Sequence, residues 1–196
     1  MKFEQPISEE IFRRKYMINE ESSPEQVFMD VAEEISEAEL PNKREQIKQE
    51  FYQALSSGEL IPGGRILANA RTYSKLKNYN NCFTIDVEDS MEGIYGSLRE
   101  DAIISSMGGG VGFDISKLRP EGAFISKGGE SSGPLSFLRV FDQSAKVIHT
   151  GGGRRSAHIA LMDVSHPDIE KFITIKQGDK NKELTQFNIS VRITDD

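Results

Sequence analysis

The sequence predicts an α/β fold in which a helical segment at residues 1–60 precedes part of a sheet or barrel at residues 61–196. Two observations support this fold class. In the first segment, apolar side chains recur at the three- and four-residue spacing of helices. Beyond about Gly63, four short apolar runs alternate with three helical segments, which is typical of α/β folds rather than of β-sandwiches.

Two helices are predicted in the first segment. One begins at Ser23, whose oxygen can cap a backbone N–H, with Pro24 at the first helical position and Gln26 placed to complete a capping box. Its apolar face carries Val27, Val31, Ile35 and Ala38. The other spans about residues 43–55 and ends before Gly58. Neither buries enough apolar surface alone, so we expect both to pack as a cap on a larger body.

The elements of the second segment follow in regular order. Strands are expected at 81–87, 111–115, 158–164 and 187–193, and helices at 91–106, at 135–148 and, in short form, after Pro167. Asp89 and Ser90 precede the first of these helices, where short polar side chains act as N-caps. The two long helices carry apolar stripes broad enough for a core or for a subunit interface.

Charge is distributed unevenly along the chain. The net charge is −7, and the acidic excess lies wholly in residues 1–60, with 7 basic and 14 acidic residues. A clamp for a nucleic-acid backbone concentrates Lys and Arg, so we expect no nucleic-acid partner. No apolar run approaches the roughly 18 residues of a membrane helix, and the first ten residues lack the apolar core of a signal peptide. We therefore expect a soluble cytoplasmic protein.

Cys82 is the single cysteine, which excludes an internal disulfide and a multi-cysteine zinc site. Its place in an apolar strand favours a buried, inert thiol. His149, His158 and His166 show no spacing typical of metal ligands, so no metal site is predicted.

Three glycine-rich loops lie at the ends of predicted elements, at 106–114, 126–134 and 149–158. Glycine lets a backbone approach a phosphate or a sugar closely, but none of the loops is a Walker or dinucleotide-binding motif, and each alone favours a tight turn. In the third loop, Arg154 and Arg155 either bind phosphate, or are solvated or paired with carboxylates. The residues alone therefore predict a phosphate- or nucleotide-handling α/β domain.

From about Leu60 onward the chain resembles the large, catalytic subunit of ribonucleotide reductase in its adenosylcobalamin-dependent form. Six ordered blocks carry the resemblance: IPGGRILANA at 61–70, NCFTIDVEDSMEGIY at 81–95, GGGVGFDISKLRPEGA at 108–123, GGESSGPLSFLRVFD at 128–142, GGGRRSAHIALMDVSHPDIEKFI at 151–173 and FNISVRITD at 187–195. The resemblance implies a ten-stranded α/β barrel of two five-stranded halves. This chain would hold the helical cap and the first part of that barrel, and a complementary chain would hold the rest.

The resemblance implies radical chemistry on a ribonucleotide. In the family, a cysteine thiyl radical removes the ribose 3'-hydrogen, the 2'-hydroxyl leaves as water, and a cysteine pair supplies two electrons by forming a disulfide. Cys82 matches the first member of that pair, whereas its partner and the radical cysteine match positions beyond this sequence. Gly64 and Arg65 match a loop that contacts the substrate phosphate. Asn81, Cys82 and Gly110 match positions that approach the ribose.

The resemblance also implies an allosteric site for a deoxynucleoside triphosphate or ATP. Asp89 matches the carboxylate that accepts a hydrogen bond from the effector sugar, and Ser90 and Met91 lie beside it. Arg119 and Lys127 match cations around the effector phosphates. The loop that sets substrate specificity matches Thr150, Gly151, Gly152 and Arg154.

Several partners follow from the resemblance. They are a complementary chain that holds most of the adenosylcobalamin site, a second copy joined through the helices at 91–106 and 135–148, and a thioredoxin- or glutaredoxin-type reductant. No membrane partner is implied. The alternative is a non-catalytic nucleotide-binding or assembly module derived from the same family, with effector contacts and dimer helices but no chemistry.

Overall fold

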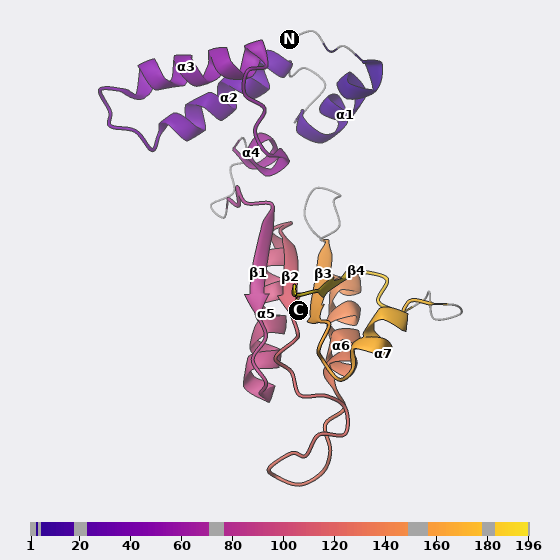
Figure 1. The fold of residues 1–196 in the computed structure, drawn as a ribbon. Coiled ribbons are helices and arrows are strands. Elements are labelled where there is room, and N and C mark those ends of the chain that lie inside the picture. Colours follow the sequence, from indigo (N-terminus) through magenta and orange to yellow (C-terminus); the bar gives the residue numbers. More distant parts are fainter. Residues whose placement is uncertain are drawn as a thin grey trace. The chain divides into compact units, whose positions relative to one another are not determined.

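The computed structural model describes residues 3, 5–17, 23–70, 77–148, 157–177 and 183–195. They form two compact units, Met1–Asn81 and Cys82–Asp196, which run from indigo to purple and from magenta to yellow in Figure 1. Each unit has its own hydrophobic core, and the two are described separately.

The first unit is helical. It contains α1 (Pro6–Tyr16), α2 (Pro24–Ser36), α3 (Arg44–Ser57) and α4 (Gly64–Asn69). Helix α2 packs along α3, and α1 and α4 pack on α2 and on each other. Val27 and Ala32 of α2 are fully buried at the centre of this core. Helices α2 and α3 were predicted from the sequence, whereas α1 was not. Helix α4 was also not predicted, because the two glycines at 63 and 64 indicated a turn.

The predicted helix ends are confirmed except for one side chain. Ser23 Oγ accepts a hydrogen bond from the N–H of Gln26 at 3.2 Å, as expected for the N-cap of α2. The Gln26 amide does not complete a capping box but donates to Asp30 at 2.6 Å, because a carboxylate one turn along the helix is a charged acceptor. Gly58 ends α3 with a φ of 82°, which glycine adopts without strain.

The second unit is a parallel sheet with helices in its crossover connections. It contains β1 (Cys82–Asp86), α5 (Met91–Ser106), β2 (Gly110–Asp114), α6 (Pro134–Val147), β3 (His158–Asp163), α7 (Ile169–Thr174) and β4 (Phe187–Arg192). The strands pair in chain order, β1-β2-β3-β4, and every pair is parallel. The predicted α/β fold is confirmed. Within the described residues the sheet is open, as expected for part of a barrel.

The two faces of this sheet differ in burial. One face lies under the helices and carries Val111, Phe113, Ala160, Met162 and Phe187, all nearly or fully buried. Helix α5 packs on β1 and β2 and also contacts α6, so these two helices cover the same side. Successive strand residues point to opposite faces, and the residues between the buried ones are exposed or half-buried.

The two units divide after Asn81, whereas the composition of the sequence changes near residue 60. The difference arises because α4, which follows the change in composition, packs on α1 and α2. The change in composition near residue 60 reflects a rise in glycine and proline content and does not mark the boundary between the units. Residues 64–69 belong to the first unit because α4 packs on its helices.

Candidate functional site

The amino edge of the sheet presents the only cysteine of the sequence. Cys82 is the first residue of β1, and alternation along the strand places its side chain on the same face as Thr84 and opposite the buried Ile85. The thiol is free and exposed. The prediction that this thiol is buried is therefore wrong, because the side chain faces away from the helix-covered core.

Glycines leave space around the thiol. Gly110, the first residue of β2, is the register partner of Cys82, so no side chain stands beside Cys82 on that strand. The preceding Gly109 is required by close packing, since a Cβ there would lie 2.6 Å from Ile104 and 2.8 Å from Phe83. The structure thus brings together Cys82 and Gly110, two of the predicted ribose-contacting residues.

The other predicted substrate residues lie in the helical unit. Gly64 and Arg65 form the first turn of α4, not the loop that the resemblance implied, and Arg65 is buried. The Asn81 amide lies against the same turn, because a Cβ on Gly63 would be 2.7 Å from Asn81 Nδ2. A Cβ on Gly64 would lie 2.9 Å from the Tyr16 hydroxyl. Asn81 therefore lies beside the start of α4.

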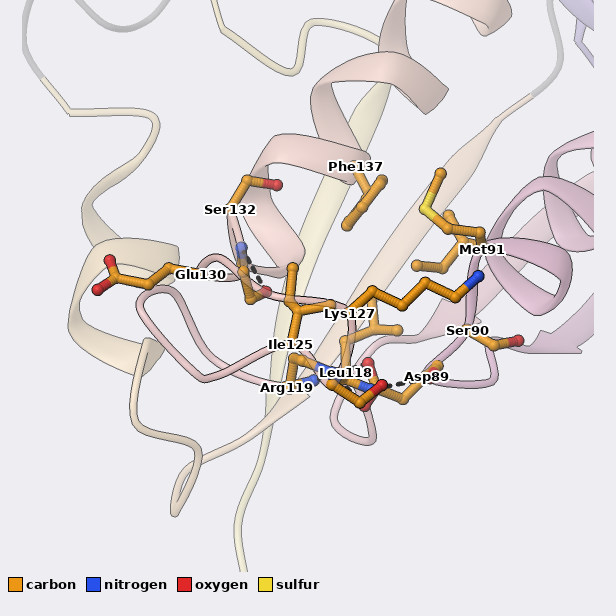
Figure 2. Close-up of a pocket in the computed structure, with 14 residues that line it drawn as sticks. Asp89, Ser90, Met91, Leu118, Arg119, Ile125, Lys127, Glu130, Ser132 and Phe137 are labelled. Carbon is orange, nitrogen blue, oxygen red and sulfur yellow. Dashed lines mark hydrogen bonds and ion pairs between the residues drawn. The ribbon is translucent and has the colours of Figure 1, made fainter.

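A cavity of about 460 Å³ at the carboxyl edge of the sheet is lined by all five predicted effector residues (Figure 2). Asp89 and Ser90 follow β1, and Met91 begins α5. Arg119 and Lys127 come from the loop between β2 and α6. Residues from two separate crossover connections therefore meet at one place.

Ser90 has the predicted capping role. Its Oγ accepts a hydrogen bond from the N–H of Gly93 at 2.9 Å, which satisfies one of the free donors at the start of α5. The cavity thus borders the N-terminus of a 16-residue helix, where the aligned peptide dipoles favour negative charge.

Asp89 and Arg119 are joined directly. Arg119 Nε donates to Asp89 Oδ2 at 2.8 Å, and the Arg119 backbone N–H donates to Oδ1 at 3.2 Å. The guanidinium also donates to the Phe124 carbonyl at 3.4 Å. About a third of each charged side chain is exposed, so the pair remains accessible from the cavity. Each carboxylate oxygen keeps a lone pair for another donor.

Lys127 supplies a second cation. Figure 2 shows its side chain extending from the loop toward the start of α5. Within the described ranges, no carboxylate lies within 4.0 Å of its ammonium group. Ile94, Leu118, Ile125 and Phe137 give the cavity apolar walls, and Ser126, Glu130, Ser131, Ser132 and Gly133 complete its lining. Sequence reasoning did not assign the four apolar residues to the site, because apolar residues on helices and in loops look alike whether they line a cavity or a core.

Asp168, which does not line the cavity, holds the loop between β2 and α6 through hydrogen bonds. Its Oδ2 accepts from the Glu121 N–H at 2.8 Å, and its Oδ1 accepts from the Lys171 ammonium at 3.1 Å. Burial alone would raise the pKa of Asp168, but these donors outweigh burial and lower the pKa below its ordinary value. His166 adds a contact, since its Nε2 lies 2.8 Å from the Leu118 carbonyl.

Thr150, Gly151, Gly152 and Arg154, predicted as the specificity loop, lie outside the described residues. In the part of the chain that the structure describes, no three His, Cys, Asp or Glu side chains gather closely enough to hold a metal ion. None of the described helices is both long and apolar enough to span a bilayer.

Comparison with known proteins gives the same family for both units. The model of the all-alpha domain of ribonucleotide reductase matches residues 2–75, and that of its barrel domain matches residues 80–196. A vitamin B12-dependent ribonucleoside-diphosphate reductase from Thermoplasma acidophilum is 43% identical over 147 residues, which are 74% of this chain and 19% of the relative.

Two further relatives extend the comparison. An enzyme of the same name from Mycobacterium tuberculosis is 40% identical over 156 residues, covering 79% of this chain and 22% of the relative. The ribonucleoside-diphosphate reductase subunit alpha of Helicobacter pylori is 32% identical over 163 residues, covering 81% of this chain and 20% of the relative. The chain spans about a fifth of the length of these relatives. With its helical unit followed by a parallel α/β sheet, it belongs to the ribonucleotide reductase family and corresponds to the N-terminal region of the large subunit.

Proposed function

We propose that this chain is the N-terminal portion of a ribonucleotide reductase catalytic subunit. It reduces ribonucleotides to deoxyribonucleotides once it is joined to a completing part that carries the radical cysteine. The observation that carries the proposal is the exposed Cys82 thiol at the start of β1, at the position of the family's reducing cysteine. On the face away from the helix-covered core, this thiol is accessible to both a substrate and a second thiol.

In the proposed reaction, Cys82 supplies half of the reducing equivalents. A thiyl radical on the completing part takes the ribose 3'-hydrogen and later returns it. The bond between the 2'-carbon and its oxygen breaks, and the hydroxyl leaves as water. Cys82 and a second cysteine supply two electrons and two hydrogens, one hydrogen ending in the departing water and the other on the 2'-carbon, and the two sulfurs are left joined as one disulfide. A thioredoxin- or glutaredoxin-type dithiol must then reduce this disulfide before the next turnover.

For the source of the radical we propose adenosylcobalamin, since two relatives named for their dependence on vitamin B12 are 40% and 43% identical to this chain. The described residues do not fit a corrin site of their own. His158 and His166 carry side chains of the kind that bind cobalt, but both are buried and hydrogen-bonded within the core. We therefore assign the cofactor to the completing part.

The cavity at the carboxyl edge supports an effector site for a deoxynucleoside triphosphate or ATP. Asp89 offers carboxylate oxygens to a sugar hydroxyl, and Arg119 and Lys127 supply positive charge for phosphates. The apolar walls suit the face of a base. The N-terminus of α5 adds to the attraction for the negatively charged phosphates.

The outer surfaces of α5 and α6 support a homodimer. Large apolar side chains are exposed on both helices: Met91, Tyr95 and Ile103 on α5, and Val140 and Val147 on α6. Because α5 and α6 contact each other, these side chains belong to neighbouring helices on one side of the sheet. A second copy of the chain would remove this apolar surface from water.

The reducing role is tested by combining the chain with its completing polypeptide and assaying adenosylcobalamin-dependent formation of deoxynucleotides. With a dithiol protein as reductant, we expect Cys82→Ser to lose sustained turnover, because serine cannot form the disulfide. Thr84→Ser, two residues along the same face of β1, is the matched control and should retain turnover. Full activity of Cys82→Ser would overturn the catalytic role and favour the non-catalytic nucleotide-binding module.

A further inference from the structure

A buried polar cluster joins the end of α5 to the start of β3. His158 Nε2 lies 2.8 Å from Asp101 Oδ1 and 3.2 Å from Ser105 Oγ, and the Ser105 hydroxyl donates to Asp101 at 3.0 Å. All three residues are almost completely shielded from solvent. The His158 ring is stacked near the rings of Phe113 and Phe187, so the polar atoms lie within an otherwise aromatic core.

Stability alone is a poor explanation for this cluster. A carboxylate taken from water into a core loses solvation, and apolar side chains of similar volume are often as stable or more stable than a buried polar pair. Hydrogen bonds depend on geometry, so Asp101 and Ser105 fix the orientation of the His158 ring. Apolar side chains in the same places would allow the helix and the strand to shift relative to each other. The cluster therefore holds β3 and the last turns of α5 in one relative position.

Helix α5 connects the two predicted sites. Its N-cap Ser90 and its first residue Met91 line the effector cavity, and its last turns carry the polar cluster. At about 1.5 Å per residue, the 16 residues of the helix separate these ends by roughly 24 Å. A helix of this length moves as a rigid body, so a displacement of its first turn also displaces its last turns.

The other side of the cluster is the amino edge of the sheet. His158 is in register with Val111, which directly follows Gly110, the register partner of Cys82. The carbonyl of Ala157 accepts a hydrogen bond from the Val111 N–H at 2.9 Å, so β3 is tied to β2 at this level. The cluster thus lies one residue inside the edge that presents the Cys82 thiol.

We propose that Asp101, Ser105 and His158 are positioning residues that transmit occupancy of the effector cavity through α5 to the amino edge of the sheet, where the substrate is selected. The inference rests on the proposed function, because it requires both nucleotide sites. A nucleotide in the cavity shifts the start of α5. The directional bonds of the cluster then oblige β3, and with it the edge beside Gly110 and Cys82, to follow.

The test separates positioning from stability with two variants of the assembled enzyme. His158→Met keeps the volume but leaves the buried Asp101 with Ser105 as its one remaining side-chain donor in the cluster, so it should lower the thermal midpoint. Asp101→Leu combined with His158→Met removes both polar partners and should recover most of that loss. We expect both variants to lose most of the change in relative kcat/KM between two substrates that a change of effector produces. Effector affinity should stay within about twofold, since no residue of the cluster lines the cavity.

Three further outcomes complete the test. His158→Gln, which keeps a side-chain N–H donor, should retain a larger part of the effector response than His158→Met does. If the double variant recovers both stability and the full effector response, the cluster is only structural and the inference is overturned. If the wild-type enzyme itself shows no effector response, the proposed effector site fails and the inference fails with it. The wild-type measurement therefore distinguishes the two failures.

Discussion

At the scale of single residues, Asp89 and Asp168, which lie near the cavity at the carboxyl edge, differ in what they do. Asp89 lines the cavity and is bonded to Arg119, so its oxygens are both oriented and accessible. Asp168 lies behind the loop and is almost fully buried, with its oxygens occupied by Glu121 and Lys171. The first is placed to meet a ligand, and the second is placed to hold the loop.

Asp89→Ala should weaken the binding of deoxynucleoside triphosphates by about tenfold or more, because a charge-assisted hydrogen bond to the sugar is lost. Isothermal titration calorimetry of the chain with each nucleotide measures the effect. Asp86→Ala is the control, since this exposed carboxylate near Lys117 does not line the cavity. Unchanged affinity in Asp89→Ala would contradict the effector assignment.

Asp168→Asn should lower the free energy of unfolding at pH 7 by about 1–2 kcal/mol, through loss of charge-assisted hydrogen bonds. The pKa of Asp168 is lowered in the folded state, so its stabilising effect is present above the unfolded pKa of about 3.9. That effect disappears as the pH falls through the lower, folded pKa. Urea unfolding at several pH values should show wild type and variant converging in acid, and a difference that is constant with pH would contradict this account.

At the scale of elements, α5 contributes to the cavity, to the core beneath the sheet and to an exposed apolar surface. Its first turn borders the cavity, one side packs on β1 and β2, and the exposed Met91, Tyr95 and Ile103 extend its apolar surface outward. Helices that bury only one stripe usually keep the rest polar. The exposed apolar residues of α5 and α6 therefore carry the prediction of a dimer.

Ile103→Glu should convert a dimer into a monomer, because a charge within an apolar interface is desolvated without a partner. Sedimentation velocity over a range of concentrations measures the change. Ile7→Glu makes the same substitution at an exposed apolar residue of α1 and should leave the dimer intact. A dimer that survives Ile103→Glu would show that this surface is not the interface.

At the scale of the whole molecule, the order of elements was predictable, whereas several contacts were not. The strands and long helices of the second unit were predicted from their apolar patterns. Ser90 caps the start of α5 and Gly58 ends α3, as their residue types indicate. The exposure of Cys82 was missed because a strand pattern does not tell which face is covered. The Asp89–Arg119 pair joins positions 30 residues apart, and no local pattern reports such a distance.

The cluster around Asp101 was missed for a related reason. A carboxylate within an amphipathic helix normally indicates a solvated position, but here its partner is His158, 57 residues further along the chain. The resemblance to a family assigned five residues to one nucleotide site, and the structure shows that these five line one cavity. The helices, strands and helix caps could be predicted from neighbouring residues in the sequence. The polar pairs between distant residues could be seen only in the folded structure.

In the proposed reaction, Cys82 gives up its thiol hydrogen during reduction of a ribonucleotide. The most direct test is a single turnover of the fully reduced, assembled enzyme without any external reductant, followed by acid quenching and mass spectrometry of its cysteine peptides. We expect one disulfide between Cys82 and a cysteine of the completing part to appear for each deoxynucleotide formed. Formation of deoxynucleotide while Cys82 remains a free thiol would contradict it.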